Sequence, residues 1–344
     1  MTSMLPLPLF DQLHWCDPLS GLPLEPLISA RTPAGVPVCG ALRIAGTATG
    51  YPIVDCVARL TPELAQQHRA WLTPFDLTPP GDDASTPFQD QQSVASFGFQ
   101  WTWNSSMRSE ADLCWRVARR FQLEPAAFAG QLVLDAGAGA GDQSRWLLQQ
   151  GSHVVSIDLS SAIDVVAQKL RMHPGWVGIQ SDITVLPFAS NQFDLVYCEG
   201  VIPFTHDSAL TVQELCRMLR NGGLILATHY ETGTRLHGHM RLALTLALRR
   251  HLSHLERYQL LFITGALATL VYLPVIGPVL RRSGLIPYSP VMPSFKTTWT
   301  NTFDLYGDHA YQRYISPDRF WRFFAQAGMI PRYRQGGVVA AQKP

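Results

Sequence analysis

Leu132 to Gly141 reads Leu-Val-Leu-Asp-Ala-Gly-Ala-Gly-Ala-Gly, and the elements expected on either side of it depend on this stretch. Its apolar start predicts a buried strand that Asp135 closes, and the glycines at every second position predict a turn into a helix that begins near Asp142. Glycine lets the backbone adopt left-handed angles and come close to a ligand. The stretch therefore predicts a turn that cradles a ligand between a strand and a helix.

The spacing of these glycines argues against a dinucleotide ligand. A dinucleotide-binding turn needs Gly-x-Gly-x-x-Gly, and counted from Gly137 the third glycine would fall at Asp142. The Gly-Lys-Ser/Thr ending of a phosphate-binding loop is absent as well. A second strand, Val154 to Ile157, ends in Asp158, whose carboxylate can accept hydrogen bonds from both ribose hydroxyls of a nucleoside. The sequence therefore favours a nucleoside-containing ligand that is not a nicotinamide dinucleotide.

Five stretches, beginning with the glycine turn itself, follow one another in a fixed order. They are Val133–Gly139, Ser156–Ser160, Gln180–Ile183 with Leu186–Phe188, Phe193–Cys198 with Glu199 at its tip, and Glu214–Gly223. In this order they resemble the motifs of class I S-adenosylmethionine-dependent methyltransferases. The resemblance covers roughly residues 130–230 and, more weakly, the C-terminus.

The order of apolar and polar segments predicts an α/β fold. Strands are expected at 132–135, 153–157, 177–180, 193–198 and 224–229, and helices at 142–150, 161–171 and 208–219. The resemblance implies a seven-stranded, Rossmann-like methyltransferase sheet with helices on both faces, completed by strands at 329–333 and 337–342. We expect an irregular, ribbon-like N-terminal segment at 1–95 and a methyltransferase domain at 96–344, with a helical insertion at 231–315 after the fifth strand.

The resemblance implies S-adenosylmethionine as the cofactor and gives its site. Asp135 and Gly137 would lie under the methionine portion, and Gly139 and Gly141 would allow close approach. Asp158 would bind the ribose, and Asp182 with Ile183 would flank the adenine. The remaining expected cofactor-binding residues are Leu159, Glu199 and Trp101.

The catalytic residues are harder to place from the sequence. A hydroxyl acceptor must lose a proton during methyl transfer, and histidine suits this near neutral pH. The resembling family often has Gly-Val-Leu-His-His-Thr after the fourth strand, but Pro203 and Phe204 stand at the two histidine positions here. His206 and His229 are the remaining catalytic candidates, and a purely structural role stays open for both. Expected substrate-binding residues are Trp103, Tyr230, His309 and Tyr311.

Composition limits the class of substrate. The chain has 344 residues, 47% of them hydrophobic and 15% charged, with a net charge of +1. An average soluble protein has about 25% charged residues, so extra apolar surface is expected for a lipid-like substrate, a partner or a membrane face. With only three lysines, a basic stripe for nucleic acid would have to be built from arginine, so we do not expect an RNA or DNA substrate.

These observations favour a methyltransferase that acts on a small, hydrophobic molecule, with O-methylation favoured over N- or C-methylation. A catalytically silent S-adenosylmethionine-binding partner protein and a nicotinamide-dependent oxidoreductase are the alternatives. Six scattered cysteines without a Cys-x-x-Cys pair, and a start without a basic cluster, favour a cytoplasmic protein with free thiols.

The N-terminal segment resembles a metal-binding module only in part. Tyr51 to Asp55 resembles the stretch that closes a small zinc ribbon in some methyltransferases, but the paired cysteines of the ribbon are missing. We therefore expect a remnant that binds no metal.

The insertion carries a long uncharged stretch, Tyr258 to Leu280, bounded by Arg257 and by Arg281 with Arg282. Its length would suffice for a membrane span, but Pro274, Gly277 and Pro278 would break a helix there. Three interpretations stay open: a helical lid over a hydrophobic substrate, a homodimer interface, and peripheral contact with a membrane.

Overall fold

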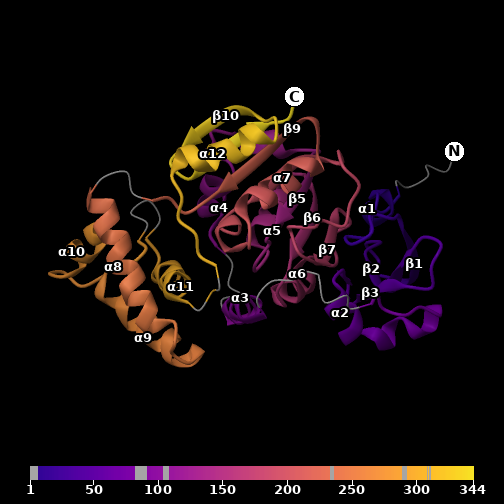
Figure 1. Cartoon of the computed structure of the whole chain (residues 1–344), viewed down its shortest axis with the longest axis horizontal. Helices are drawn as coiled ribbons and strands as arrows, with labels where there is room; N and C mark the ends of the chain where they lie inside the picture. Colours follow the sequence, from indigo (N-terminus) through magenta and orange to yellow (C-terminus); the bar gives the residue numbers. More distant parts are fainter. Residues whose placement is uncertain are drawn as a thin grey trace.

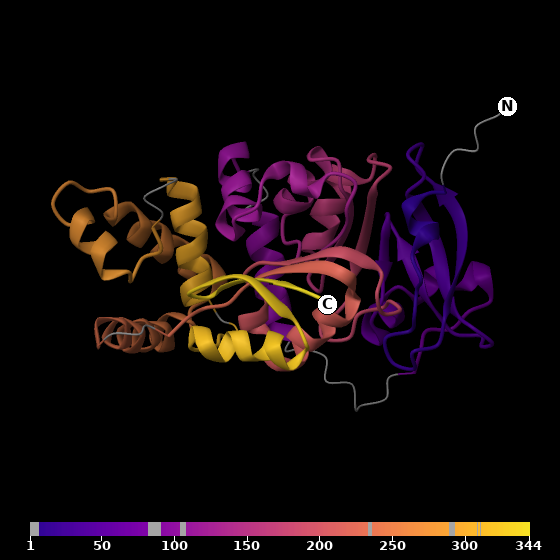
Figure 2. The same ribbon diagram turned by 90° about the horizontal axis from the view of Figure 1, so that it is seen from above.

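The computed structural model describes residues 7–81, 91–103, 108–232, 236–288, 293–307, 309 and 311–344. A central α/β unit separates two other parts, the N-terminal strands at one end of the molecule and helices α8–α11 at the other (Figure 1). The view from above shows the same arrangement, with the C-terminal strands and α12 on the central unit (Figure 2).

One mixed sheet of 11 strands runs through the N-terminal and central parts, in the order β1-β2-β3-β4-β7-β6-β5-β8-β9-β11-β10. The strands are β1 (Leu24–Arg31), β2 (Pro37–Ile44), β3 (Gly50–Val54), β4 (Val57–Arg59), β5 (Leu132–Ala136), β6 (His153–Asp158), β7 (Trp176–Gln180), β8 (Phe193–Cys198), β9 (Leu219–Thr228), β10 (Ile330–Gln335) and β11 (Val338–Gln342). The five central strands β7, β6, β5, β8 and β9 are parallel, and β10 and β11 are antiparallel to their neighbours.

Alternation along β5 and β6 places a hydrophobic core on each face of the sheet. Leu134 and Val155 belong to one core, with Val212 of α7 and Phe320 of α12. Val133 and Val154, one residue earlier on each strand, belong to the other core, which holds side chains of α4, α5 and α6. The helices around the sheet are α1 (Leu9–Gln12), α2 (Pro62–Gln67), α4 (Glu110–Val117), α5 (Asp142–Gln149), α6 (Ala162–Leu170), α7 (Ser208–Met218) and α12 (Pro317–Gln326). The expected α/β fold with helices on both faces is thus present.

The expected count of seven strands is not confirmed, because β1–β4 extend the expected strands β5–β11 to a sheet of 11. The N-terminal segment is not irregular: β1–β4 form antiparallel pairs, and β4 joins the edge of the central sheet in parallel with β7. Arg59 of β4 fixes this junction, donating to the Gln180 side chain at 2.5 Å and to Asp164 of α6 at 2.6 Å. Within the described residues no group of three or more His, Cys, Asp or Glu side chains could hold a metal ion, so the resemblance to a zinc ribbon has no support.

The insertion is helical, as expected. It contains α8 (Leu236–Leu252), α9 (Arg257–Leu270), α10 (Gly277–Ser283) and α11 (Phe295–Tyr306). Leu260 of α9 packs with Phe303 and Tyr306 of α11 in a small separate core, and the Trp299 indole donates to the Leu261 carbonyl at 2.9 Å. In the part of the chain that is described, no helix combines the length and the apolar character needed to cross a membrane.

Helix α3 (Gln91–Trp103) joins the insertion to the central unit, and the expected boundary between residues 95 and 96 falls inside it. Phe99 packs against Tyr258 and Phe303 of the insertion. A side chain at Gly98 would come within 2.8 Å of Ser161, just ahead of α6, so glycine allows the helix to lie close to the central unit. The aromatic-rich stretch 97–103 therefore belongs to a helix that contacts both parts.

Candidate functional site

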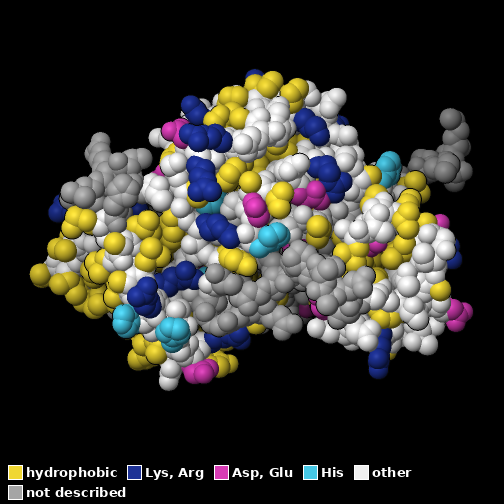
Figure 3. All heavy atoms as spheres, viewed as in Figure 1, with side chains coloured by type: hydrophobic (Ala, Val, Ile, Leu, Met, Phe, Trp, Pro, Cys, Tyr) yellow, Lys and Arg dark blue, Asp and Glu magenta, His cyan; other side chains and the backbone are white. Residues whose placement is uncertain are grey.

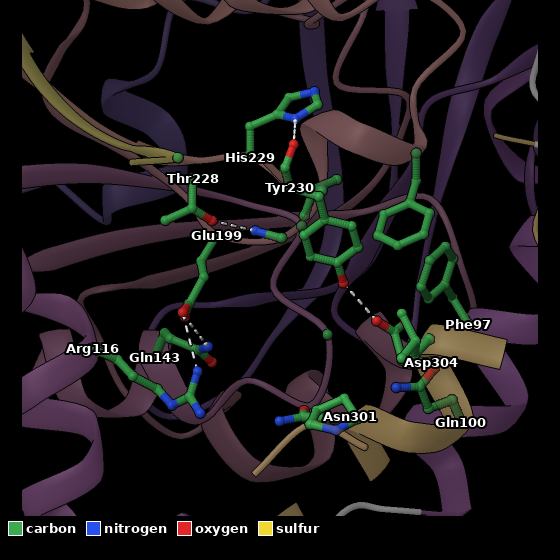
Figure 4. Close-up of a pocket in the computed structure, with 18 of the residues that line it drawn as sticks. Phe97, Gln100, Arg116, Gln143, Glu199, Thr228, His229, Tyr230, Asn301 and Asp304 are labelled. Carbon is green, nitrogen blue, oxygen red and sulfur yellow. Dashed lines mark hydrogen bonds and ion pairs between the residues drawn. The ribbon is translucent and has the colours of Figure 1, made fainter. Parts of the chain in front are cut away.

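A cavity of about 890 Å³ lies at the carboxyl ends of the central strands. β5 has a parallel neighbour on each side, β6 on one and β8 on the other, so the strand order reverses at β5. Open α/β sheets bind ligands at such a switch point. Side chains from α3, from the loops after β5, β6, β8 and β9, and from the insertion line the cavity, and Figure 4 shows several of them.

The glycine turn forms one wall. Gly137 has φ +87° and Gly139 has φ +51°, so both adopt the left-handed region that favours glycine. A Cβ at Gly137 would lie 2.1 Å from the Val201 side chain, and one at Gly139 would lie 3.0 Å from the Trp101 ring. Both glycines and Trp101 line the cavity. Gly141 does not, because it faces Val166 of α6, which a Cβ there would meet at 2.9 Å.

Asp158 lies at the tip of β6 and lines the cavity, as does Leu159. One carboxylate oxygen accepts from the Gly139 amide at 2.9 Å, and the other accepts from the Ser160 amide and hydroxyl at 2.9 and 2.6 Å. Burial raises the pKa of Asp158, and these hydrogen bonds oppose the rise. Asp158 therefore ties the glycine turn to the second strand and still presents its carboxylate to the cavity.

Buried acceptors without partners face the same region. Asp182 lines the cavity with Ile183, and its Oδ1 accepts from the Thr184 amide and hydroxyl, each at 2.8 Å. Its Oδ2 is buried and has no hydrogen-bond partner among the described residues, which is also true of Gln100 Oε1. Buried polar atoms without partners are costly, so these oxygens indicate places where a ligand can donate hydrogen bonds.

Asp135 lies beneath the glycine turn and does not line the cavity. It is 2% exposed, and the Ser144 hydroxyl donates to it at 2.5 Å. Burial raises the pKa of Asp135 to about 7. The carboxyl group of Asp135 therefore holds the first turn of α5 through Ser144, and it can affect a ligand only through the position of the glycine turn.

Glu199 lies at the centre of a charged cluster at the other side of the turn. Its Oε1 accepts from Arg116 at 3.1 Å and from Arg120 at 2.7 Å, and its Oε2 accepts from the Tyr197 hydroxyl at 2.8 Å. Burial favours the neutral acid, but the two guanidinium groups outweigh burial and lower the pKa of Glu199 to about 2. Arg108 also lines the cavity and makes a looser contact, 4.0 Å from Nε to the Asp112 carboxylate. This wall therefore offers guanidinium groups to a negatively charged ligand group.

The two candidate histidines lie in different places. His229 follows β9 and is among the cavity residues, yet both ring nitrogens face protein atoms: Nδ1 lies 2.9 Å from the Tyr230 carbonyl and Nε2 lies 3.3 Å from the Ser208 hydroxyl. Burial lowers the pKa of His229 to about 4, so the ring is neutral near pH 7. His206 is not among the cavity residues, and its carbonyl accepts from Arg313 at 2.6 Å.

Tyr230 is the expected substrate residue that does line the cavity, and its hydroxyl donates to Asp304 of α11 at 2.8 Å (Figure 4). Trp103 lies outside the cavity, because its ring packs edge-on against Trp299 with centroids 4.6 Å apart. The His309 ring stacks on the Phe97 ring with centroids 4.4 Å apart, and Phe97 lines the cavity while His309 does not. Tyr311 lies under the Arg313 guanidinium at 4.7 Å, away from the cavity.

Several cavity residues were not expected from the sequence. They are Gln100, Arg108, Arg116, Arg120, Asn301 and Asp304. Arg116 lies in the last turn of α4 and Arg120 in the 3-10 turn Arg119–Phe121 that follows it, so no single helical period in the sequence marked them as a pair. Asn301 and Asp304 are more than seventy residues from the nearest motif, and only the packing of α11 brings them to the site.

Comparisons with known proteins bear on the central unit. Residues 134–227 match the family model described as Methyltransferase domain. A malonyl-[acyl-carrier protein] O-methyltransferase of Enterobacter lignolyticus is 40% identical over 96 residues, 28% of this chain and 38% of that protein. A demethylmenaquinone methyltransferase of Corynebacterium efficiens is 30% identical over 159 residues, 46% of this chain and 61% of that protein.

Among solved structures, the magnesium protoporphyrin IX methyltransferase of Synechocystis PCC 6803 with bound SAH is similar with a TM-score of 0.37 and 17% identity, over 74% of this chain and 86% of that one. The chain spans less than two thirds of the length of the two curated relatives. The matched family segment begins in β5 and ends in β9, so the expected resemblance to methyltransferases is confirmed for the parallel strands that carry the glycine turn.

Proposed function

We propose that this protein is an S-adenosylmethionine-dependent methyltransferase whose acceptor is a small molecule with an apolar body. One observation carries the proposal: the glycine turn, the Asp158 carboxylate and the orphaned Asp182 oxygen line one cavity within the segment that matches the Methyltransferase domain family. An adenosyl ligand requires a backbone turn that it can approach closely, a hydrogen-bond acceptor for its ribose hydroxyls and a second acceptor for its adenine amino group.

Residues of this chain would hold the donor in a defined orientation. Asp158 would accept from the ribose hydroxyls, and Asp182 Oδ2 would accept from the adenine amino group. Arg108, whose Nε lies 4.0 Å from the Asp112 carboxylate, would pair with the methionine carboxylate. S-adenosylmethionine, when bound, supplies a methyl group that is already activated on a sulfonium sulfur.

The acceptor end of the cavity is built partly by the insertion. Leu242, Ile286 and Pro287 give it apolar walls, and Tyr230, Asn301 and Asp304 give it polar groups. We assign proton removal from an acceptor hydroxyl to Asp304, because its carboxylate can accept a second hydrogen bond while Tyr230 keeps its own proton. Burial raises the pKa of Tyr230 well above its usual range, which makes this tyrosine a donor and not a base.

Binding measurements test the donor site. Calorimetric titration with S-adenosylhomocysteine should show saturable binding, and titration with NADH should show none. Asp158→Ala should weaken S-adenosylhomocysteine binding about 100-fold, since it removes two charge-assisted hydrogen bonds. Asp318→Ala, at an exposed acid on α12, is the matched control and should bind as the wild type does. Saturable NADH binding without S-adenosylhomocysteine binding would overturn the proposal in favour of an oxidoreductase.

A transfer assay separates an enzyme from a silent partner protein. The full chain with methyl-labelled S-adenosylmethionine and a cell extract should transfer label to an organic-soluble product. Asp304→Asn should reduce this transfer while leaving S-adenosylhomocysteine binding unchanged. Binding without any transfer would favour the silent partner.

A further inference from the structure

Exposed hydrophobic side chains gather on the insertion. More than half of the large hydrophobic side chains that are exposed in the described residues lie between residues 240 and 295. The space-filling view shows them over α8–α10, at the end of the molecule opposite the N-terminal strands (Figure 3). We call the exposed apolar residues of α9, α10 and the turn between them the outer face: Tyr258, Phe262, Tyr272, Leu273, Val275, Ile276 and Val279.

The period of helix α9 determines which of its apolar side chains belong to the outer face. Tyr258 and Phe262 are one helical turn apart and are 76% and 78% exposed, while Leu260 between them is buried against α11. Gly265 lies on the inner side, where a Cβ would meet the Trp299 ring at 2.9 Å. The helix therefore buries its inner side against α11, while Phe262 stays exposed and Tyr258 has an edge-on ring contact with Phe99 alone among the described aromatic side chains.

The turn after α9 extends the outer face. Tyr272 to Ile276 are exposed in an unbroken run, and Val275 in this turn and Val279 of α10 are 84% and 65% exposed. Tyr258 suits a boundary between water and an apolar phase, because it has an apolar ring and a polar tip, whereas the Tyr272 hydroxyl is hydrogen-bonded to the Thr298 hydroxyl at 3.1 Å.

Charge around the outer face has one sign. Residues 240–288 contain six arginines and a single acid, Glu256. Arg257 precedes the outer face, Arg281 and Arg282 follow it, and all three are exposed. An apolar surface bordered by arginines is the pattern that binds the headgroup region of an anionic bilayer.

We infer that the outer face docks this protein on the surface of an anionic lipid membrane. A second copy of the chain is a poorer occupant, since a two-fold contact would place the same arginines against each other. Neighbouring parts of the insertion line the cavity: Leu242 and Thr245 of α8, and Ile286 to Tyr288 after α10. A lipid-soluble acceptor leaving the bilayer would therefore meet the acceptor end of the cavity, and this last step alone rests on the proposed function.

Vesicle binding tests the inference without any methyl transfer. The full chain should co-sediment with vesicles of phosphatidylcholine and phosphatidylglycerol, and only weakly with phosphatidylcholine alone. The double change V275D/V279D should reduce binding about tenfold or more, because it puts two charges into the apolar part of the face. The double change R257Q/R282Q should reduce binding about thirtyfold, for two exposed arginines near an anionic surface. M172D, at an exposed methionine beyond α6, is the matched control and should bind as the wild type does.

S-adenosylhomocysteine binding and far-ultraviolet circular dichroism show whether each variant is folded. A folded V275D/V279D protein that binds anionic vesicles like the wild type would overturn the inference. So would a wild-type protein that forms a dimer by light scattering and becomes monomeric with V275D/V279D while never binding vesicles. Because vesicle binding needs no cofactor, a failure here leaves the donor-binding experiment unaffected, and the reverse is also true.

Discussion

At the scale of single residues, Glu199 carries a prediction about stability. Its carboxylate is 11% exposed and is paired with Arg116 and Arg120, so removing its charge takes the acidic partner from Arg120 and leaves Arg116 with Asp112 alone. Glu199→Gln should lower the free energy of unfolding at pH 7 by about 3 kcal/mol, measured by urea denaturation. Glu124→Gln, which breaks the exposed pair with Arg119, should change it by less than about 0.5 kcal/mol.

The same residue gives a pH dependence. The pKa of Glu199 is lowered to about 2 from its ordinary value of 4.5, so its stabilisation is complete above pH 4.5 and is lost as the pH falls toward 2. The difference between wild type and Glu199→Gln should therefore shrink to about half by pH 3. A difference that stays constant between pH 7 and pH 3 would show that the carboxylate is not held by its arginines.

Residue predictions from the sequence depended on how local the signal was. Gly137, Gly139 and Asp158 could be found because a glycine turn and a strand-end acid have fixed spacing, and the structure puts all three on one cavity. Asp304 could not be found, because nothing near it in the sequence resembles a site. His309 and Trp103 have chemistry that suits a binding site, but their rings are used in packing.

At the scale of elements, the closest packing in the insertion is between α9 and α11. Gly265 permits it, since any side chain there would meet the Trp299 indole. Gly265→Val should destabilise the protein by about 1–3 kcal/mol through overpacking, measured by thermal unfolding. Ala266→Val, one residue along on the exposed side, is the control and should change stability little. Equal effects at both positions would contradict close packing at Gly265.

The elements also show why sequence patterns succeeded in one part and failed in another. The central strands are apolar runs buried on both faces, and helices of regular period separate all of them except β7 and β8, so their order could be predicted. β1 contains Pro26 and is mostly half-buried or exposed, and β4 has only three residues, so neither gives a clear pattern. α3 is rich in Phe, Trp and Gly, which are weak helix formers, and contacts on two sides determine its conformation.

At the scale of the whole molecule, the sheet continues without a break from β1 to β10. The N-terminal strands and the central unit should therefore unfold together, in one transition that is the same by tryptophan fluorescence and by circular dichroism. Arg59→Ala should lower stability by about 2 kcal/mol, because it leaves the buried Gln180 side chain without its donor at the β4–β7 junction. Arg43→Ala, in an exposed pair with Glu25 on β1 and β2, is the control. Two separate transitions in the wild type would mean that the junction is weak.

Helix α3 has a consequence for the molecule as a whole. Trp101 lies over the Gly139 backbone, and Trp103, two residues on, packs against Trp299 of the insertion. A ligand that fixes the position of α3 at the turn also biases how the insertion sits, and thermodynamic linkage makes this influence reciprocal. If a bound donor changes the affinity of the insertion for its ligand by some factor, that ligand must change the affinity of the cavity for the donor by the same factor.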